Sequence, residues 1–186
     1  MYFWIAALLP ESSEKHIRDV CLPLIRAEDI SNTAFLLTQH ISLKISFWAD
    51  DKDAQAIKEY LTFFFQRQTP FKIITDKVES QGEILWLKIK DNPQLERLHE
   101  ELTEGLENSF KILPHKFDHS FIYHTTIAID KRKEKIAWLF NQVKDKWQEK
   151  EVLISSFVIG TSPDGEINTW KEVRKISVAP SSTDEN

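Results

Sequence analysis

The sequence has one cysteine, no block of about five or more like charges, and no apolar stretch long enough to cross a membrane. A single cysteine excludes an intrachain disulfide. The 24 Lys and Arg residues are outnumbered by 29 Asp and Glu residues. This balance argues against a long track for duplex nucleic acid, because such binding needs many cationic contacts to phosphates. A small nucleotide or an RNA end remains a possible partner.

The N-terminal segment Met1–Pro10 is apolar, yet it lacks the basic start and the small-residue cleavage site of a signal peptide. We expect a core strand here and a cytoplasmic protein that does not bind membranes. Cys21 lies on an apolar helical stripe, where it should fill core space. With 41% hydrophobic residues, residues 1–178 should form one domain and 179–186 a disordered polar tail.

Alternating and helical hydrophobic periods predict the following elements in the first half. They are a strand over Met1–Leu9, a helix capped by Ser12 or Ser13, a strand over Phe35–Trp48, a helix capped by Asp50 or Asp51, and a hairpin of Phe71–Val78 and Glu83–Lys90.

The second half repeats this plan. Its elements are a helix that begins at Asn92-Pro93, a strand over Phe121–Ile129, a helix capped by Asp130 with an apolar stripe reaching Trp147, and a hairpin of Val152–Ile159 and Glu166–Val178. Trp4 and Trp86 are 82 residues apart, and His40 and His124 are 84 apart. The repeat predicts a bilobal α+β fold with a pseudo-twofold axis, in which two antiparallel sheets face a central groove and carry helices on their outer faces.

Side chains two residues apart in a strand point to the same face. His40, Ser42 and Lys44 therefore form one polar row, and His124 and Thr126 share a face of the second strand. Serine and threonine are common, so two His-x-Ser/Thr hits among six histidines are weak evidence alone. Their equivalent places in the repeat make them convincing, because a twofold axis would bring the four groups together.

Two imidazoles and two hydroxyls suit the chemistry of ribose phosphate esters. One histidine can accept a proton from attacking water while the other donates one to the leaving oxygen. The hydroxyls can donate hydrogen bonds to the non-bridging phosphate oxygens. This chemistry requires neither a metal ion nor another cofactor.

Three segments, 39–43, 84–87 and 121–127, resemble landmarks of the 2H phosphoesterase superfamily, specifically its 2′-5′ RNA ligase-like and cyclic-phosphodiesterase members. The resemblance covers roughly residues 1 to 178. It implies a bilobal fold and hydrolysis of 2′,3′-cyclic phosphates or 2′-5′ linkages, with ligation in some members. By position, His40 and His124 would be the acid–base pair, and Ser42 and Thr126 would hold the phosphate.

Two residues depart from the pattern of that superfamily. Ser42 stands where threonine is common, which keeps the hydroxyl donor, and Tyr123 stands where many members have proline. Proline would fix the entry into the strand, so Tyr123 bears on the local backbone more than on the chemistry.

Further candidates have plainer explanations. Lys44 could contact a phosphate, and Lys88 occupies a comparable position in the hairpin. His115 and His119 could line the groove, but their spacing from His124 does not suit a metal site. His16 and His99 are expected at the surface. Most aromatic residues have core spacing, while Tyr2, Trp4 and Trp170 are unassigned.

The sequence therefore predicts a monomeric, metal-independent phosphodiesterase with a nucleotide or an RNA end as its substrate. Three alternatives remain open: a non-catalytic module that binds nucleotides or RNA ends, a 2′-5′ RNA ligase, and a protein whose paired histidines are coincidental.

Overall fold

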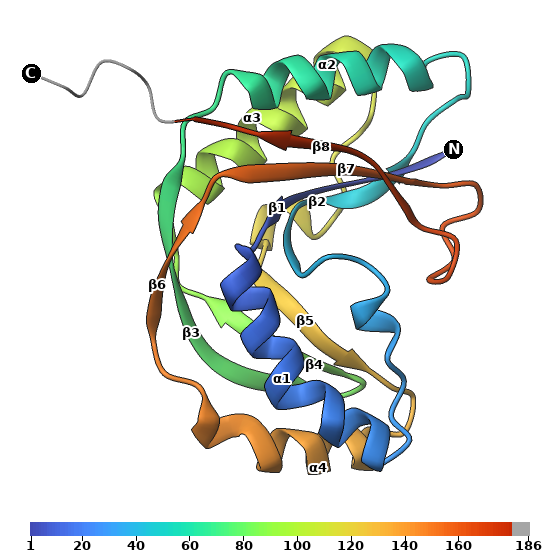
Figure 1. Cartoon of the computed structure of the whole chain (residues 1–186). Coiled ribbons are helices and arrows are strands. Elements are labelled where there is room, and N and C mark those ends of the chain that lie inside the picture. Colours follow the sequence, from blue (N-terminus) through green and yellow to red (C-terminus); the bar gives the residue numbers. More distant parts are fainter. Residues whose placement is uncertain (180–186) are drawn as a thin grey trace, which may run out of the picture.

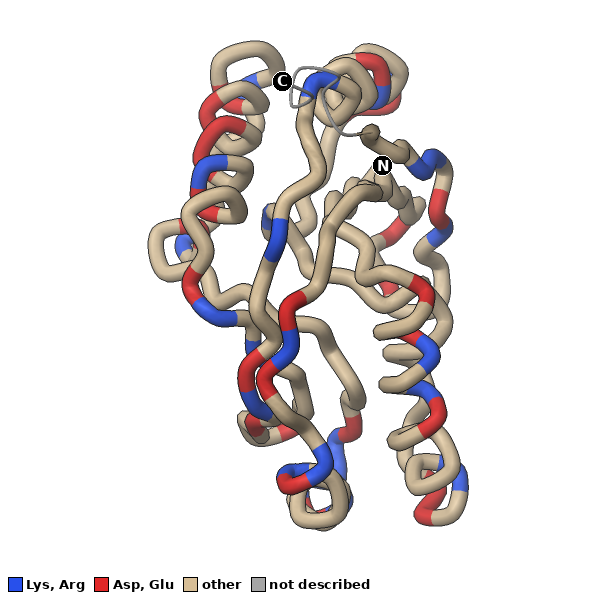
Figure 2. The backbone as a smooth tube through the Cα atoms, turned by 60° about the vertical axis from the view of Figure 1, so that its left-hand side comes forward, with Lys and Arg blue, Asp and Glu red and all other residues tan. Residues whose placement is uncertain are grey.

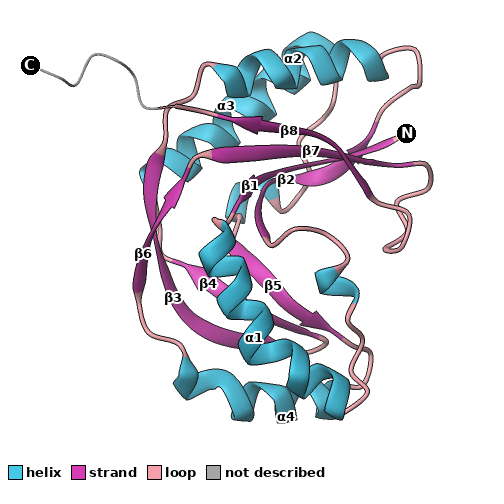
Figure 3. Ribbon diagram, in the orientation of Figure 1, coloured by secondary structure: helices cyan, strands magenta, loops and turns pink. Residues whose placement is uncertain are grey.

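The computed structural model describes residues 1–179 and contains two four-stranded antiparallel sheets (Figures 1 and 3). The predicted tail therefore lies, except for Ala179, outside the described residues. The first sheet has the order β2-β1-β7-β8 and the second the order β5-β4-β3-β6. The strands are β1 (Tyr2–Leu8), β2 (His40–Trp48), β3 (Phe71–Gln81), β4 (Ile84–Ile89), β5 (His124–Ile129), β6 (Lys150–Ile154), β7 (Ser156–Ser162) and β8 (Lys171–Ser177).

Each sheet is covered by helices. Two of the helices cross over: each follows a strand of one sheet in the chain but packs against the other sheet. The helices are α1 (Glu11–Ala27), α2 (Ala54–Gln66), α3 (Pro93–Phe110) and α4 (Lys133–Val143), with short 3-10 helices η1 (Thr33–Phe35), η2 (Asp118–Ser120) and η3 (Lys144–Lys146). Helix α1 follows β1 but contacts α4 and β5, whereas α3 follows β4 but contacts β2 (Figure 1). The predicted α+β fold with two antiparallel sheets is confirmed, but each lobe combines elements from both halves of the sequence.

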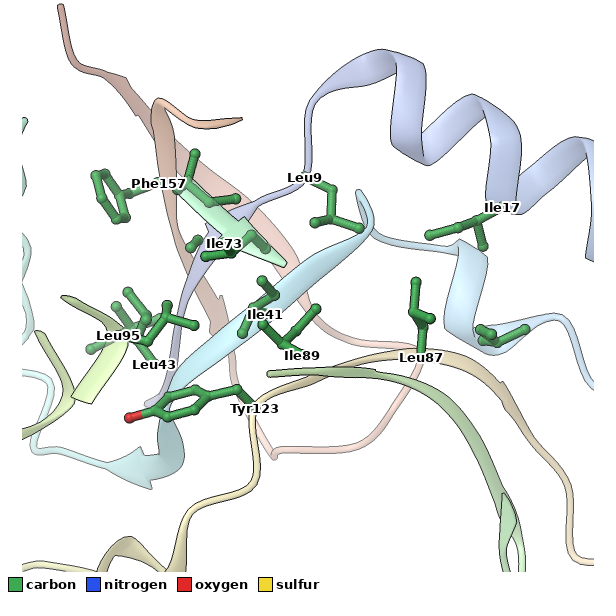
Figure 4. Close-up of a cluster of buried hydrophobic side chains, with 14 of the residues drawn as sticks. Leu9, Ile17, Ile41, Leu43, Ile73, Leu87, Ile89, Leu95, Tyr123 and Phe157 are labelled. Carbon is green, nitrogen blue, oxygen red and sulfur yellow. The ribbon is translucent and has the colours of Figure 1, made fainter. Parts of the chain in front are cut away.

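One continuous hydrophobic core joins the two sheets. Ile41 of β2, Ile89 of β4 and Phe157 of β7 belong to the same buried cluster (Figure 4). Cys21 is fully buried in it, as expected, and burial raises the pKa of its thiol to about 12. Phe64, Phe65, Phe140 and Trp147, predicted as core aromatics, are also part of this cluster or pack against it.

Only one of the predicted helix caps is confirmed. Asn92 accepts hydrogen bonds from the backbone N–H groups of Gln94 and Leu95, with Pro93 in the first turn. Helix α1 instead follows Pro10, and α2 follows Asp53, both without a side-chain cap. The Asp130 carboxylate is occupied elsewhere, because it accepts hydrogen bonds from the Ser31 N–H and from Arg132.

Two predicted elements end earlier than the hydrophobic pattern suggested. Helix α4 ends at Val143, and Trp147 packs on the core from an extended segment. The predicted strand Val152–Ile159 is interrupted at Ser155: β6 pairs with β3 of the second sheet, and β7 pairs with β1 and β8 of the first. Strands β6 and β7 look like one apolar strand in the sequence because both contain buried side chains, although they belong to different sheets.

Charged residues of both signs are interspersed along the helices and loops (Figure 2). None of the helices among residues 1–179 combines the length and the apolar composition that crossing a membrane requires.

Candidate active-site groove

The two strands that carry the motifs lie at the edges of their sheets. Strand β2 is an edge strand of the first sheet and β5 of the second, and the two strands contact each other. An edge strand leaves one row of its backbone groups without a neighbour in its own sheet. Here the two free edges face each other, so that residues from both halves of the sequence meet between the lobes.

A β-bulge follows the motif in each strand. Ser42 lies opposite Ala6 and Lys44 opposite Ile5, which leaves Leu43 as an extra residue. In β5, Thr126 lies opposite Trp86 and Ala128 opposite Leu85, which leaves Ile127 extra. A bulge re-aims the residues that follow it. The two motif strands therefore have a bulge at equivalent positions, although β2 has a second register shift between Lys44 and Phe47 that β5 lacks.

The bulges correct two expectations from the sequence. After Leu43 the alternation of buried and half-buried side chains fails, because Leu43 and Lys44 are both buried, whereas His40 and Ser42 are half-buried. The tryptophans are also not equivalent in register. Trp86 faces Thr126, whereas the residue that faces Ser42 is Ala6, and Trp4 lies two residues before Ala6 in β1.

A cavity of about 340 Å³ lies between the motif strands. It is lined by Trp4, Leu37, His40, Ser42, Lys44, Ile45, Ser46, Phe121, His124 and Trp170. We call it the groove. It brings together four of the five predicted site residues; the fifth, Thr126, is half-buried on the same strand as His124 and is not among the lining residues.

Each motif histidine is oriented by the backbone two residues before it. The Nδ1 atom of His40 lies 2.7 Å from the Thr38 carbonyl, and that of His124 lies 2.7 Å from the Ile122 carbonyl. Because a carbonyl only accepts, Nδ1 carries the hydrogen in both rings. The Nε2 atoms therefore carry no hydrogen and can act as acceptors.

A tryptophan packs against each of these imidazoles, with ring centroids 4.3 Å apart in both pairs. Trp4 contacts His40 edge-on, and Trp86 contacts His124 at a tilt. Gly160 lies opposite Trp4, where a Cβ atom would come within 2.3 Å of the indole. Glycine at this position therefore lets the Trp4 ring lie across β7.

Both histidines are held in the neutral form more strongly than usual. Burial lowers the pKa of His40 from 6.5 to about 4, and the charge of His124 acts in the same direction. The Thr38 carbonyl and the Glu172 carboxylate oppose this change. Burial also lowers the pKa of His124, against the effect of the Ile122 carbonyl. At neutral pH the free groove therefore presents two uncharged imidazoles.

Two contacts outside the motifs support the histidines. Glu172 accepts a hydrogen bond of 2.8 Å from the Thr38 N–H, so it helps to hold the residue whose carbonyl orients His40. Thr125, on the opposite face from His124, donates to the Gln39 side chain at 3.2 Å. This second bond links the residue before one motif histidine to the residue after the other.

Lys44 forms a buried ion pair with Asp118. Its Nζ lies 2.6 Å from Asp118 Oδ2, and the two side chains are 1% and 2% exposed. The sequence suggested Lys44 as a possible contact for a phosphate; in the structure its ammonium is paired with a carboxylate, although Lys44 also lines the groove. Lys88 lies directly opposite His124 in the ladder and is half-buried.

None of the other four histidines, all of which the structure describes, lines the groove. His119 is exposed and lines a separate cavity beside α3, and His115 is exposed and packs on Phe117. His16 is exposed, as expected, but the surface prediction for His99 is wrong, since His99 is 6% exposed. Its position four residues after Leu95 on the apolar helical stripe was the available signal. Within residues 1–179, no group of three or more His, Cys, Asp or Glu side chains has an arrangement suited to a metal ion.

The remaining predictions concern aromatic residues. Trp4 and Trp170 line the groove. Tyr2 instead lies beside Gly165 in the turn before β8. The Tyr123 ring is buried in the core, and its carbonyl accepts a hydrogen bond from the Ile89 N–H, so the ladder with β4 extends to the residue before His124.

The family described as the 2′-5′ RNA ligase superfamily matches residues 10–166 of the chain. A protein of Geobacillus kaustophilus named "Putative phosphoesterase" is 29% identical over 67% of this chain and 75% of its own length. A protein of the same designation from Oceanobacillus iheyensis is 28% identical over 70% of this chain and 75% of its length. A third protein of this designation, from Bacillus cereus, is matched over 50% of its own length, with 31% identity over 43% of this chain.

Solved structures share the fold. TT0787 of Thermus thermophilus superposes with a TM-score of 0.67 at 16% identity, covering 95% of this chain and 97% of that one. Escherichia coli LigT with bound NADP+ gives a TM-score of 0.61 at 14% identity, covering 95% and 96%. At these identities the likeness shows the shared fold alone.

Proposed function

The chain belongs to the 2′-5′ RNA ligase superfamily, and from this membership we propose that it is a phosphoesterase of 2′,3′-cyclic phosphates or 2′-5′ phosphodiester bonds in nucleotides or RNA ends. The observation that carries the proposal is the pair of neutral imidazoles in one groove, each with Nδ1 donating to a backbone carbonyl.

The proposed mechanism uses the free Nε2 atoms of His40 and His124. One accepts a proton from water as it attacks phosphorus. The other takes up a proton on Nε2 when the phosphate anion binds beside it, since a nearby negative charge favours the imidazolium, and donates that proton to the departing ribose oxygen. Ser42 and Thr126 donate hydrogen bonds to the non-bridging oxygens, where negative charge accumulates. Their positions two residues after the histidines, before each bulge, support these roles. The mechanism needs no metal ion.

The proposed cationic contact to the phosphate is Lys88 rather than Lys44. Residues directly opposite in an antiparallel pair share a face of the sheet. Lys88 therefore lies on the same side as the His124 imidazole, while Lys44 is already paired with Asp118.

A nucleotide or RNA end is the proposed partner on two grounds. The apolar and aromatic walls formed by Trp4, Phe121 and Trp170 suit an unpaired base, which can stack on aromatic rings. Structures of LigT have been determined with 3′-AMP and ATP.

The proposal is tested with purified protein in EDTA and a panel of nucleoside 2′,3′-cyclic phosphates, cyclic-phosphate RNA ends and 2′-5′ dinucleotides. Wild type should turn over at least one of them. His40→Gln and His124→Gln should each lower kcat by about 100-fold or more, because each removes a proton-transfer group. Ser42→Ala and Thr126→Val should lower kcat by about 10-fold or more. The matched control is His16→Gln, which changes an exposed histidine on α1.

Absence of turnover on the whole panel, or His40→Gln and His124→Gln variants as active as wild type, would contradict the proposal. Tight binding of a 2′-phosphorylated nucleotide without turnover would instead assign the groove a binding role. Joining of RNA ends into 2′-5′ linkages would assign it a ligase activity.

A further inference from the structure

A third histidine, His99 of α3, is buried behind the groove and contacts two backbone carbonyls. Its Nδ1 lies 2.8 Å from the Leu43 carbonyl and its Nε2 lies 2.9 Å from the Asp118 carbonyl. A carbonyl oxygen can only accept a hydrogen bond, so both ring nitrogens have to donate. A neutral imidazole has one N–H and can serve only one of these carbonyls, whereas an imidazolium serves both.

The two carbonyls belong to the segments that carry the motifs. Leu43 is the extra residue of the β2 bulge, immediately after Ser42. Asp118 lies in η2, the last element before β5. The Lys44–Asp118 ion pair joins the same two segments a second time. His99 and this ion pair therefore both connect the first motif strand, β2, to the η2 loop that precedes His124.

His99 also supports a wall of the groove. The Phe121 ring packs against the imidazole with centroids 4.6 Å apart, and Phe121 lines the groove together with Ser42 and His124. Movement of His99 would therefore displace both the bulge after Ser42 and an aromatic wall.

Several acidic side chains lie near His99. The Asp118 carboxylate belongs to the residue whose carbonyl His99 contacts; burial opposes its ionisation, but the hydrogen bonds from Lys44 and the His115 N–H hold its pKa below the usual range. From β2, Lys44 faces the same carboxylate. On the outer side, Glu100, Glu104, Glu107 and His119 share a cavity with His99. Tyr123 lies beside Phe121. The only other cationic side chain among these groups, Lys44, is neutralised by Asp118.

We propose that His99 is a positioning residue of the groove, which as a doubly donating imidazolium ties the β2 bulge to the η2 loop and so fixes Ser42 and Phe121 relative to His124. The predicted effect of His99 on turnover depends on the proposed function. The prediction that His99 donates two hydrogen bonds as a cation does not depend on it.

The charge state is tested by 15N NMR of the full chain labelled on histidine. The His99 ring signals are assigned from their loss in His99→Phe. At pH 7 both His99 ring nitrogens should show the shifts of protonated nitrogens, while His40 and His124 should each show one protonated and one bare nitrogen. A ring nitrogen of His99 that carries no hydrogen at pH 7 would overturn the proposal that His99 donates to both carbonyls, whether or not the protein turns over any substrate.

The positioning role is tested with His99→Phe, which keeps the contact with Phe121, and His99→Gln, which keeps one donor. Below the unfolding temperature, both should weaken binding of inorganic phosphate, followed by the amide shift of Ser42, and lower kcat/KM by about 10- to 100-fold. His99→Gln should retain more activity than His99→Phe. His16→Phe is the matched control and should behave as wild type.

Wild-type phosphate affinity and turnover in a folded His99→Phe variant would overturn the positioning role. If neither variant folds, the nitrogen shifts of the wild-type protein still show whether both His99 ring nitrogens donate hydrogen bonds. Lack of turnover by wild type would reject the proposed function but leave the phosphate titration and the nitrogen shifts as tests of His99.

Discussion

Each groove histidine is held by the same kind of contact, although the residues that make it differ. Both imidazoles donate from Nδ1 to the carbonyl two residues earlier, and both pack on a tryptophan from a neighbouring strand. The backbone contact follows from the strand geometry, while the tryptophans come from positions that are not equivalent in register. The result is two imidazoles with the same tautomer and with lowered pKa values.

The lowered pKa of His40 predicts a pH dependence of stability. The unfolded chain binds a proton at this residue near pH 6.5, but the folded chain resists protonation until about pH 4. Between these values the unfolded state binds more protons, so the free energy of unfolding should fall as the pH falls, by up to about 3 kcal/mol from this residue. Urea denaturation at several pH values measures it.

His40→Gln should lose less stability than wild type between pH 6.5 and pH 4, because it removes the group that resists protonation. His16→Gln, at an exposed position, should follow the wild-type curve. Parallel curves for wild type and His40→Gln would contradict the lowered pKa.

At the scale of elements, the groove depends on two edge strands and the loops that precede them. Strands β2 and β5 each begin at their motif histidine, after the 3-10 turns η1 and η2 and short irregular segments. The hydrophobic pattern predicted that both strands begin earlier, at Phe35 and Phe121, because these residues are large and apolar. In the structure Phe35 is buried beside the core and Phe121 lines the groove.

The buried Lys44–Asp118 pair connects β2 to η2 and gives a prediction at this scale. Lys44→Met or Asp118→Leu alone should each destabilise the fold by about 3 to 5 kcal/mol, because the partner charge is left unpaired away from water. The double variant should be far less destabilised than the sum of the two, since it leaves no buried charge. A double-mutant cycle in urea measures the coupling; additive losses would contradict it.

At the scale of the whole molecule, the lobes share one core and exchange helices. The buried cluster contains residues from both sheets and from all four α-helices. Figure 4 shows part of it, including Ile17 of α1 and Leu95 of α3. Arg132, at the start of α4, donates to the Asp29 carbonyl after α1, and Asp130 accepts from the Ser31 N–H. We propose that neither lobe is an independent folding unit.

This arrangement predicts a single cooperative unfolding transition. Far-UV circular dichroism and tryptophan fluorescence should give the same urea midpoint, because the lobes share one core. The six tryptophans are spread over both halves of the sequence, so fluorescence reports on both. Ile41→Ala removes a side chain from the shared core and should lower both midpoints together, with a loss of about 2 to 5 kcal/mol. Separate midpoints for the two signals would show that the lobes unfold independently.

The sequence by itself determined the elements and the candidate chemistry. Alternation marked both motif strands, helical periods marked four helices, and the repeat paired His40 with His124, because these signals depend on residues close together in the chain. It also located the Asn92 cap correctly.

Only the tertiary structure decided which side chains face the groove and which support it. The bulges at Leu43 and Ile127, the pairing of Lys44 with Asp118, and the burial of His99 all depend on contacts with segments distant in sequence. The division of Val152–Ile159 between two sheets depends on strand partners in the same way. A local pattern records that a residue is apolar or polar, but not which partner will satisfy it.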